Sequence, residues 1–149
     1  KGGMGEVYRA MDFLGRPRAI KITRIDRLTD QLKKRFFQEA RGMDRLKHDH
    51  LVPILEYSEH LGVPYFTMNV YEMSVKDLIE KQGMTQQSAF QIFRDSVSGL
   101  AHLHSLNYVH RDFKPGNILV DANSRGIVSD FGLIKHLAPI DLDGITVDN

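Results

Sequence analysis

The sequence predicts an α+β fold in which a small antiparallel sheet comes first and a helical part follows. Three observations support this prediction. Apolar residues alternate at strand spacing near the start of the chain, they recur at helical spacing over 29–47, and two more strand-like segments then precede two further helical ones. Strands, helix, strands, helices and short strands, in that order, are typical of a sheet-rich part followed by a helical part.

Four strands are expected in the sheet-rich part, and turn residues separate them. Their expected ranges are 6–10, 18–25, 51–57 and 64–71. Gly15-Arg16-Pro17 is the expected turn between the first two strands, and Gly62-Val63-Pro64 is the expected turn between the last two. Both pairs of strands are therefore expected to form hairpins.

Three helices are expected, over 29–47, 75–81 and 85–105. Thr29 or Asp30 would cap the first helix, and Gly83 would end the second. The first helix has one apolar face, made of Leu32, Phe36, Ala40, Met43 and Leu46. The third has a broader one, made of Ala89, Phe90, Phe93, Val97, Leu100, Ala101 and His104. Residues 108–135 are expected to form short extended pieces and turns, and the last 14 residues a mobile loop.

The composition indicates one globular domain and argues against several other classes of protein. A chain of 149 residues with 42% hydrophobic residues can bury a core of its own. The net charge of +1 gives no reason to expect nucleic acid or an anionic membrane as partner. The absence of cysteine excludes disulfides and thiolate metal sites and fits a reducing compartment, so the cytoplasm is the expected location. No apolar run approaches the length of a membrane span.

Four short segments carry residue types suited to phosphate and metal chemistry. Two lie near the start of the chain, Gly2-Gly3-Met4-Gly5-Glu6-Val7-Tyr8 and Arg18-Ala19-Ile20-Lys21. Two lie in the second half, His110-Arg111-Asp112-Phe113-Lys114-Pro115-Gly116-Asn117 and Asp130-Phe131-Gly132. Each segment alone is weak evidence, and read singly it suits a flexible glycine-rich tail, a surface lysine or a plain loop. Their occurrence together in this order is specific.

These segments resemble the glycine-rich loop, the strand lysine, the catalytic loop and the metal-binding motif of the protein kinase family, in the form common in bacterial-type Ser/Thr kinases. The resemblance covers essentially the whole chain. It implies a two-lobe fold, with a small antiparallel-sheet N-lobe carrying one major helix at 1–68, a hinge at 69–72, and an incomplete helical C-lobe at 73–149 that ends in the activation loop. No Ala-Pro-Glu motif follows Asp130, so we expect the natural protein to be longer at both ends.

The resemblance implies ATP-dependent phosphorylation of Ser and Thr hydroxyls on protein substrates, with ATP and Mg²⁺ as cofactors. Asp112 would be the catalytic base and Lys114 would reach the transferring phosphate. Lys21 would pair with the α- and β-phosphates and with Glu39 of the first helix. The expected metal ligands, both with hard oxygen atoms, are Asn117 and Asp130.

The resemblance also implies a nucleotide site. Glycines allow the backbone to approach phosphates closely, and an apolar slot with a few backbone groups suits a purine. The expected nucleotide-binding residues are Gly2, Gly3, Gly5, Val7, Ala19, Lys21, Met68, Asn69, Tyr71 and Leu119. Met68 would control access to the back of the slot. On sequence alone, plain strand core explains Met68 nearly as well.

Other positions have roles that the resemblance alone supplies. A buried His110 would pack against Phe131, and Met43 would extend that apolar stack. Arg111 would pair with a phosphorylated activation-loop residue, for which Thr146 is the candidate. Arg18 stands where the family has valine. In an alternating strand that position points away from the face of the lysine, so the change concerns packing more than catalysis.

Two other functions share these residues: a pseudokinase-like nucleotide-binding regulatory module and a small-molecule kinase of the same fold. The five residues that phosphoryl transfer needs are all present, which argues against a pseudokinase: Lys21, Glu39, Asp112, Asn117 and Asp130. Protein substrates, and self-association for autophosphorylation, are the expected partners. The 149 residues alone are expected to be weakly active or inactive, with the third helix's apolar face uncovered. Membrane attachment would depend on regions outside them.

Overall fold

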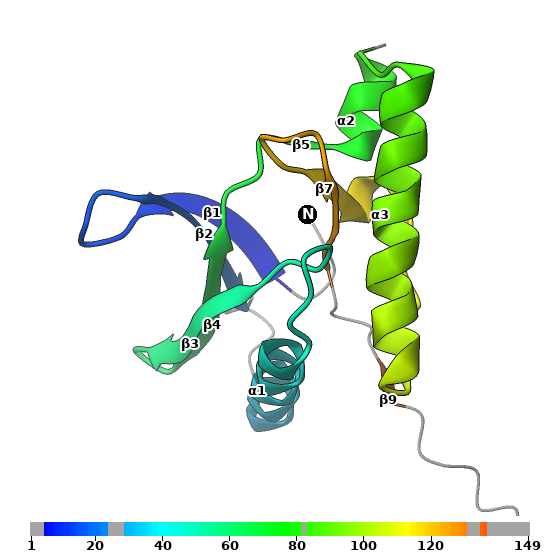
Figure 1. Cartoon of the computed structure of the whole chain (residues 1–149). Helices are drawn as coiled ribbons and strands as arrows, with labels where there is room; N and C mark the ends of the chain where they lie inside the picture. Colours follow the sequence, from blue (N-terminus) through cyan, green and yellow to red (C-terminus); the bar gives the residue numbers. More distant parts are fainter. Residues whose placement is uncertain (1–4, 24–28, 82, 131–134, 137–149) are drawn as a thin grey trace, which may run out of the picture.

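The computed structural model describes residues 5–23, 29–81, 83–130 and 135–136, without the side chains of residues 5, 23, 35, 38, 39, 135 and 136. The described elements follow the expected order (Figure 1). They are β1 (Gly5–Met11), β2 (Pro17–Thr23), α1 (Asp30–Arg45), β3 (Ile54–His60), β4 (Val63–Asn69), β5 (Met73–Ser74), α2 (Val75–Glu80), α3 (Gln86–Ser105), β6 (Tyr108–Val109), the 3₁₀ turn η2 (Pro115–Asn117), β7 (Ile118–Val120), β8 (Gly126–Val128) and β9 (Lys135–His136). The α+β class is confirmed. Of the expected mobile end, residues 137–149 lie outside the described residues.

A four-stranded antiparallel sheet of order β1-β2-β4-β3 forms the first part of the chain. Both expected hairpins are present, but the second turn was placed wrongly. It consists of Leu61 and Gly62, whose φ angles of 48° and 82° are both positive, while Val63 and Pro64 already belong to β4. Two consecutive positive φ angles match the right-handed twist of the flanking strands, which favours this tight turn over a longer one.

The third strand begins three residues later than the sequence predicts. Leu51 leaves the sheet and forms an isolated parallel bridge with Val128, so the regular strand starts at Ile54. A register shift between Ile54 and Glu56 marks the point where the chain joins the sheet. The apolar run over 51–57 therefore pairs with two segments, first with β8 and then with β4. The periodicity of the sequence cannot distinguish the two pairings.

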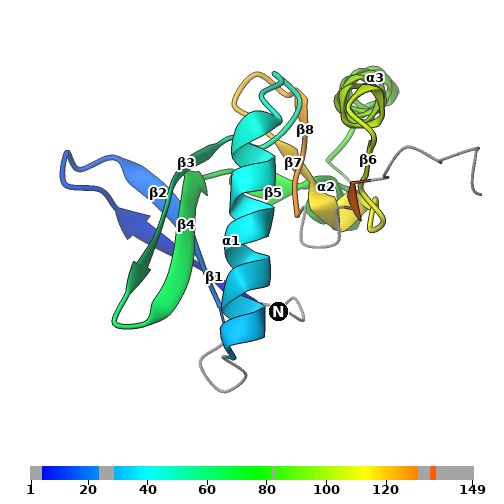
Figure 2. The ribbon, with the colours of Figure 1, turned by 90° about the horizontal axis from the view of Figure 1, so that it is seen from below.

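Helix α1 packs beside the sheet (Figure 2), and its start and its buried face agree with the prediction. Thr29 caps it, because its hydroxyl accepts the Leu32 N–H at 3.1 Å. Phe36 lies on the buried face, and its ring lies 5.4 Å from the ring of Phe66 on β4. The apolar stripe of the helix thus fixes its position against β4.

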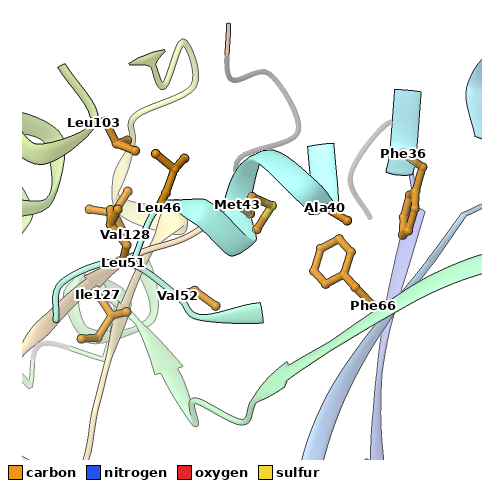
Figure 3. Packing of buried hydrophobic residues seen from close by; sticks show 10 residues of the cluster. All are labelled: Phe36, Ala40, Met43, Leu46, Leu51, Val52, Phe66, Leu103, Ile127 and Val128. Atoms are coloured by element: carbon orange, nitrogen blue, oxygen red, sulfur yellow. The ribbon is translucent and has the colours of Figure 1, made fainter. Parts of the chain in front are cut away.

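One hydrophobic cluster connects the sheet, α1, α3 and β8 (Figure 3). Its members are Phe36, Ala40, Met43, Leu46, Leu51, Val52, Phe66, Leu103, Ile127 and Val128. Since these residues come from both parts of the chain, the sheet part and the helical part share a core. A side chain removed from this cluster would affect both parts.

Helix α3 buries a different face from the one predicted. Phe90 and Phe93 are 68% and 62% exposed, whereas the small and aliphatic residues of α3 face β8 and the α1–β3 loop, namely Ile92, Ser96, Gly99 and Leu103. Small residues lie there because the backbones approach closely: a Cβ on Gly99 would lie 2.7 Å from the carbonyl oxygen of His50. Of the predicted face, Leu100 packs against the core. Phe90, Phe93 and Val97 are left uncovered by the described residues, as we expected for this stretch of chain. None of the helices described here has the length and apolar character to cross a membrane.

Candidate active site

The loop that carries Asp112 is anchored by a buried histidine. His110 is 2% exposed, its Nε2 lies 2.9 Å from the carbonyl oxygen of Ser129, and its Nδ1 accepts the Asp112 N–H at 3.3 Å. A carbonyl oxygen can only accept and an amide N–H can only donate, so we infer that the ring hydrogen is on Nε2. The expectation of a buried, satisfied histidine is confirmed. Its expected stacking on Phe131 lies outside the described residues.

The Asp112 carboxylate receives two hydrogen bonds on the same oxygen. Lys114 Nζ lies 2.6 Å from Oδ2, and Asn117 Nδ2 lies 3.0 Å from it while also donating to the Asp112 carbonyl oxygen at 2.8 Å. The Lys114 ammonium, and after it the Asn117 amide, hold the pKa of the Asp112 carboxyl below its ordinary value although partial desolvation opposes them. At neutral pH the carboxylate is therefore ionised, and its two donors hold it in one orientation. A base that accepts the hydrogen of a hydroxyl needs both properties.

Lys21 and Asp130 are separated by 109 positions in the sequence and meet in the structure. Lys21 Nζ lies 3.1 Å from Asp130 Oδ1 and 5.5 Å from the centre of the Phe66 ring. The lysine side chain is 13% exposed, whereas that of Asp130 is 43% exposed. The fold thus brings a cation suited to phosphate and a carboxylate suited to Mg²⁺ to one place.

Asn117 and Asp130 fit a magnesium ion that shares its shell with phosphate. Two hydrogen bonds from Ser129 to the Asn117 carbonyl oxygen, at 2.8 Å from N and 3.1 Å from Oγ, hold the two segments together one residue before Asp130. Carboxylate and amide oxygens are the ligands that Mg²⁺ prefers. Within the described residues no group of three or more histidine, aspartate or glutamate side chains could hold a metal. A cation bound by this pair would depend on further oxygens from a ligand or water.

The strand register places the expected nucleotide residues of the sheet on one face. Val7 pairs with Lys21, Lys21 with Phe66, and Ala19 with Met68. Directly paired residues of antiparallel strands project to the same side, so Val7, Ala19, Lys21 and Met68 share the face on which Lys21 meets Asp130. Val7 is 57% exposed, which leaves room for a ligand beside it.

The segment that joins the two parts of the chain runs from Asn69, the last residue of β4, to Glu72, just before β5. Leu119 lies near its far end on β7, half-buried against the shared core. Behind the segment is a cavity of about 1240 Å³, whose walls include Asn69 and Tyr71 but not Lys21 or the polar groups around Asp112. That cavity is a space separate from the candidate site, although both adjoin the same segment.

Arg18, the departure from the family pattern, has partners of its own on the other face of β2. Its guanidinium lies 3.0 Å from Asp12 Oδ2 and 3.5 Å from Asn69 Oδ1. It therefore connects the β1–β2 turn to the joining segment, away from Lys21.

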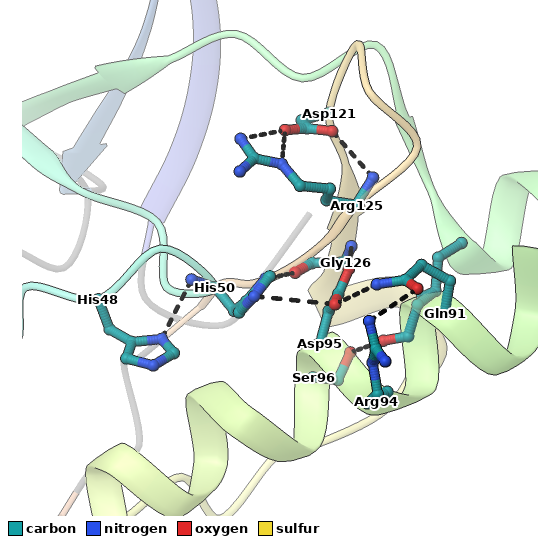
Figure 4. Close-up of polar contacts among 10 residues, drawn as sticks. His48, His50, Gln91, Arg94, Asp95, Ser96, Asp121, Arg125 and Gly126 are labelled. Carbon is teal, nitrogen blue, oxygen red and sulfur yellow. Dashed lines mark hydrogen bonds and ion pairs between the residues drawn. The ribbon is translucent and has the colours of Figure 1, made fainter.

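The sequence alone did not identify the buried carboxylate of Asp95, which supports the site through β8. Asp95 of α3 is 4% exposed and accepts the Gly126 N–H at 3.1 Å and the Gln91 Nε2 at 2.6 Å, with His50 Nε2 at 3.7 Å (Figure 4). It thereby fixes β8, the strand that leads to Ser129 and Asp130. The available signal was its position between Ile92 and Ser96, on a face that carries no other charge.

Several predicted residues cannot be placed. Gly2, Gly3, Phe131 and Thr146 lie outside the described residues, as does the side chain of Glu39, whose backbone belongs to α1. Gly5 begins β1. Lys21 contacts Asp130, and Lys114 and Asn117 contact Asp112. Hydrogen bonds from Ser129 to Asn117 join the segments of the two groups.

Comparisons with known proteins agree with this geometry. Residues 1–143 match the family model of the protein kinase domain. Serine/threonine-protein kinase PrkC of Bacillus subtilis is 38% identical over 141 residues, covering 92% of this chain and 22% of that protein. Serine/threonine-protein kinases PknA of Corynebacterium glutamicum is 33% identical over 153 residues, covering 95% of this chain and 32% of that protein.

The match extends over nearly the whole chain, which itself spans about a fifth to a third of the length of these curated relatives. It includes the segments that contribute Lys21, Asp112, Asn117 and Asp130. On this evidence the chain belongs to the protein kinase family.

Proposed function

We propose that the protein carrying this chain transfers the γ-phosphoryl group of ATP to Ser and Thr hydroxyls of protein substrates. The observation that carries the proposal is the meeting of Lys21 with Asp130, next to the polar cluster around Asp112. Relatives named serine/threonine-protein kinases support the same reaction class. The proposal includes a boundary at 69–72 between an N-lobe at 1–68 and the C-lobe residues at 73–149.

The chemistry assigned to the chain is positioning and charge compensation. Phosphoryl transfer needs little covalent help, so catalysis rests on alignment of the hydroxyl and on cations near the phosphate oxygens. Asp112 would accept the hydrogen of the substrate hydroxyl, and Lys114, 2.6 Å from it, would hold the phosphate side of the same reaction. Lys21 would bind the α- and β-phosphates, and we assign to Glu39 the role of holding the Lys21 ammonium.

ATP and Mg²⁺ are the proposed cofactors. Mg²⁺ held by Asn117 and Asp130 would neutralise charge on the phosphate oxygens. The purine would lie against Val7, Ala19 and Leu119. The nucleotide site would also use the glycine-rich stretch, Met68, and the backbone of Asn69 and Tyr71. We place this domain in the cytoplasm, because it would use ATP and because the chain has no cysteine.

The decisive test is transfer of labelled phosphate from ATP to Ser or Thr of a protein substrate by the complete gene product, with and without Mg²⁺. Asp112→Asn should lower the rate by about 10²- to 10⁴-fold, the usual contribution of a positioned base. Asp44→Asn is the matched control, because Asp44 is an exposed aspartate at the end of α1 with no ion pair among the described residues. Its rate should equal that of the wild type.

Three results would count against the proposal. Equal rates for the two aspartate variants would remove Asp112 from the mechanism. Magnesium-dependent nucleotide binding without any turnover would favour a pseudokinase-like regulatory module. Transfer to a small molecule and to no protein would favour a small-molecule kinase. The self-association included in the proposal is tested by the order of autophosphorylation in protein concentration, which should exceed one.

A further inference from the structure

Ser129, just before Asp130, makes more hydrogen bonds than its place in the sequence suggests. It is 8% exposed. Its N–H and its hydroxyl both donate to the carbonyl oxygen of Asn117, at 2.8 and 3.1 Å, and its own carbonyl oxygen accepts from His110 Nε2 at 2.9 Å. A residue of this small size thus joins the β8 end to two points of the loop that carries Asp112.

These bonds close a ring of four residues. Asp112 N–H donates to His110, His110 donates to the Ser129 carbonyl, Ser129 donates to the Asn117 carbonyl, and Asn117 Nδ2 donates back to Asp112 at 2.8 and 3.0 Å. Ser129 is the only member that comes from the β8 side. Both links of the ring between the segment of the base and the segment of Asp130, to His110 and to Asn117, are therefore made by Ser129.

The neighbouring residue needs such an anchor. Asp130 has a φ of 62°, a left-handed conformation that is less favourable for an aspartate than for a glycine. A conformation of this kind persists only where the surroundings fix it. The backbone of Ser129, held on both its N–H and its C=O, fixes the start of that turn. The hydroxyl adds a second donor to the same acceptor.

We propose that Ser129 is a positioning residue that sets Asp130 relative to Asn117, and that its hydroxyl is the part of the side chain that does so. The proposal rests on the proposed function, because it concerns the two residues assigned to Mg²⁺. Loss of the hydroxyl should loosen the metal pair while leaving the chemical groups of the site in place. The effect should therefore be seen first in the Mg²⁺ requirement.

The chain offers a matched control in Ser96. It is also a buried serine, with 0% exposure, and its hydroxyl donates to a backbone carbonyl, that of Ile92 at 2.7 Å. It lies on α3, outside the ring. Ser129→Ala and Ser96→Ala thus remove the same group from a buried position, with and without a link to the metal pair.

The first measurement is the Mg²⁺ concentration that gives half-maximal binding of a non-hydrolysable ATP analogue to the complete gene product. One neutral hydrogen bond corresponds to about a fivefold change in an equilibrium constant. Ser129→Ala should raise the Mg²⁺ requirement about fivefold, and Ser96→Ala should not change it. Ser129→Thr, which keeps the hydroxyl, should restore the wild-type value. If Ser129→Ala does not fold, Ser129→Cys keeps the size and a weaker donor, and a rise of about twofold is then expected.

The second measurement needs neither metal nor nucleotide. Amide hydrogen exchange of Asp112 and Ser129 should be faster in Ser129→Ala than in Ser96→Ala, because the ring has lost a bond. Failure of the wild type to bind Mg²⁺ and nucleotide would overturn the proposed function, whereas the exchange result would still report on the ring. Equal Mg²⁺ requirements, or equal exchange, in the two alanine variants would overturn the role of Ser129.

Discussion

A single added methyl group at Gly126 should disturb the support of the site. A Cβ added there would lie 2.6 Å from the carbonyl oxygen of Ile92 and 3.1 Å from the hydroxyl of Ser96. The backbone of α3 cannot move aside as the end of a flexible side chain can. Moving the new carbon from 2.6 to the 3.4 Å of ordinary contact requires a displacement of about 0.8 Å between β8 and α3.

The displacement would also lengthen the hydrogen bond from the Gly126 N–H to Asp95 Oδ2, which is 3.1 Å. Overpacking of a well-packed contact costs about 1–3 kcal/mol, and a weakened buried hydrogen bond adds about 1 kcal/mol. We therefore expect Gly126→Ala to lower the free energy of unfolding by about 2–4 kcal/mol. In a domain of this size that corresponds to a fall in Tm of roughly 4–16 °C.

The assay is thermal and urea unfolding of the complete gene product, with Gly42→Ala as the matched control. Gly42 lies within α1, and a Cβ there meets nothing within 4 Å. Alanine in place of a helical glycine should stabilise by up to about 1 kcal/mol. The reasoning would be refuted if the two variants had the same stability, because only the close approach at Gly126 separates them.

Two further predictions concern residues of α3 and a residue stacked on it. Burial, and then the neighbouring His102 and His50, hold the pKa of His48 below its ordinary 6.5, so the folded chain binds that proton less tightly than the unfolded chain. This difference in proton affinity stabilises the fold above pH 6.5, and the stabilisation declines as the pH falls below that value. His48→Gln should therefore make Tm fall less steeply between about pH 7 and 5.5. His104→Gln, at an exposed site, should leave that fall unchanged. Phe93→Gln should reduce self-association of the 149-residue chain in light scattering without lowering its Tm, because the ring is 62% exposed; a lower Tm would show that it packs on something.

Much of the fold followed from local patterns. The spacing of Phe36 and Ala40 identified the buried face of α1, and Thr29 marked its start. The extent of β3 and the buried face of α3 did not follow. Leu51 pairs with Val128 and not with the sheet, and no described residue buries the Phe93 ring. The extent of β3 and the buried face of α3 depend on which distant segment packs against them. The spacing of apolar residues along the sequence does not carry that information.

The candidate site divides in the same way. Asp112 and Asp130 could be identified because their chemistry occurs in short motifs with a fixed order. Ser129 and Asp95 could not, because each acts through bonds to residues far along the chain, to Asn117 and to Gly126. The residues next to Ser129 and Asp95 in the sequence give no sign of these long-range hydrogen bonds. The pairing of Lys21 with Asp130 likewise became visible only in the fold.

The central claim is that Lys21, Asn117 and Asp130 bind the phosphates and magnesium of ATP. The most direct measurement is a crystal structure of the complete gene product with Mg²⁺ and a non-hydrolysable ATP analogue. We expect Lys21 Nζ on phosphate oxygens and the Asn117 and Asp130 oxygens on the metal. A nucleotide bound instead in the 1240 Å³ cavity behind the joining segment, with the 3.1 Å contact between Lys21 and Asp130 unchanged, would contradict the account.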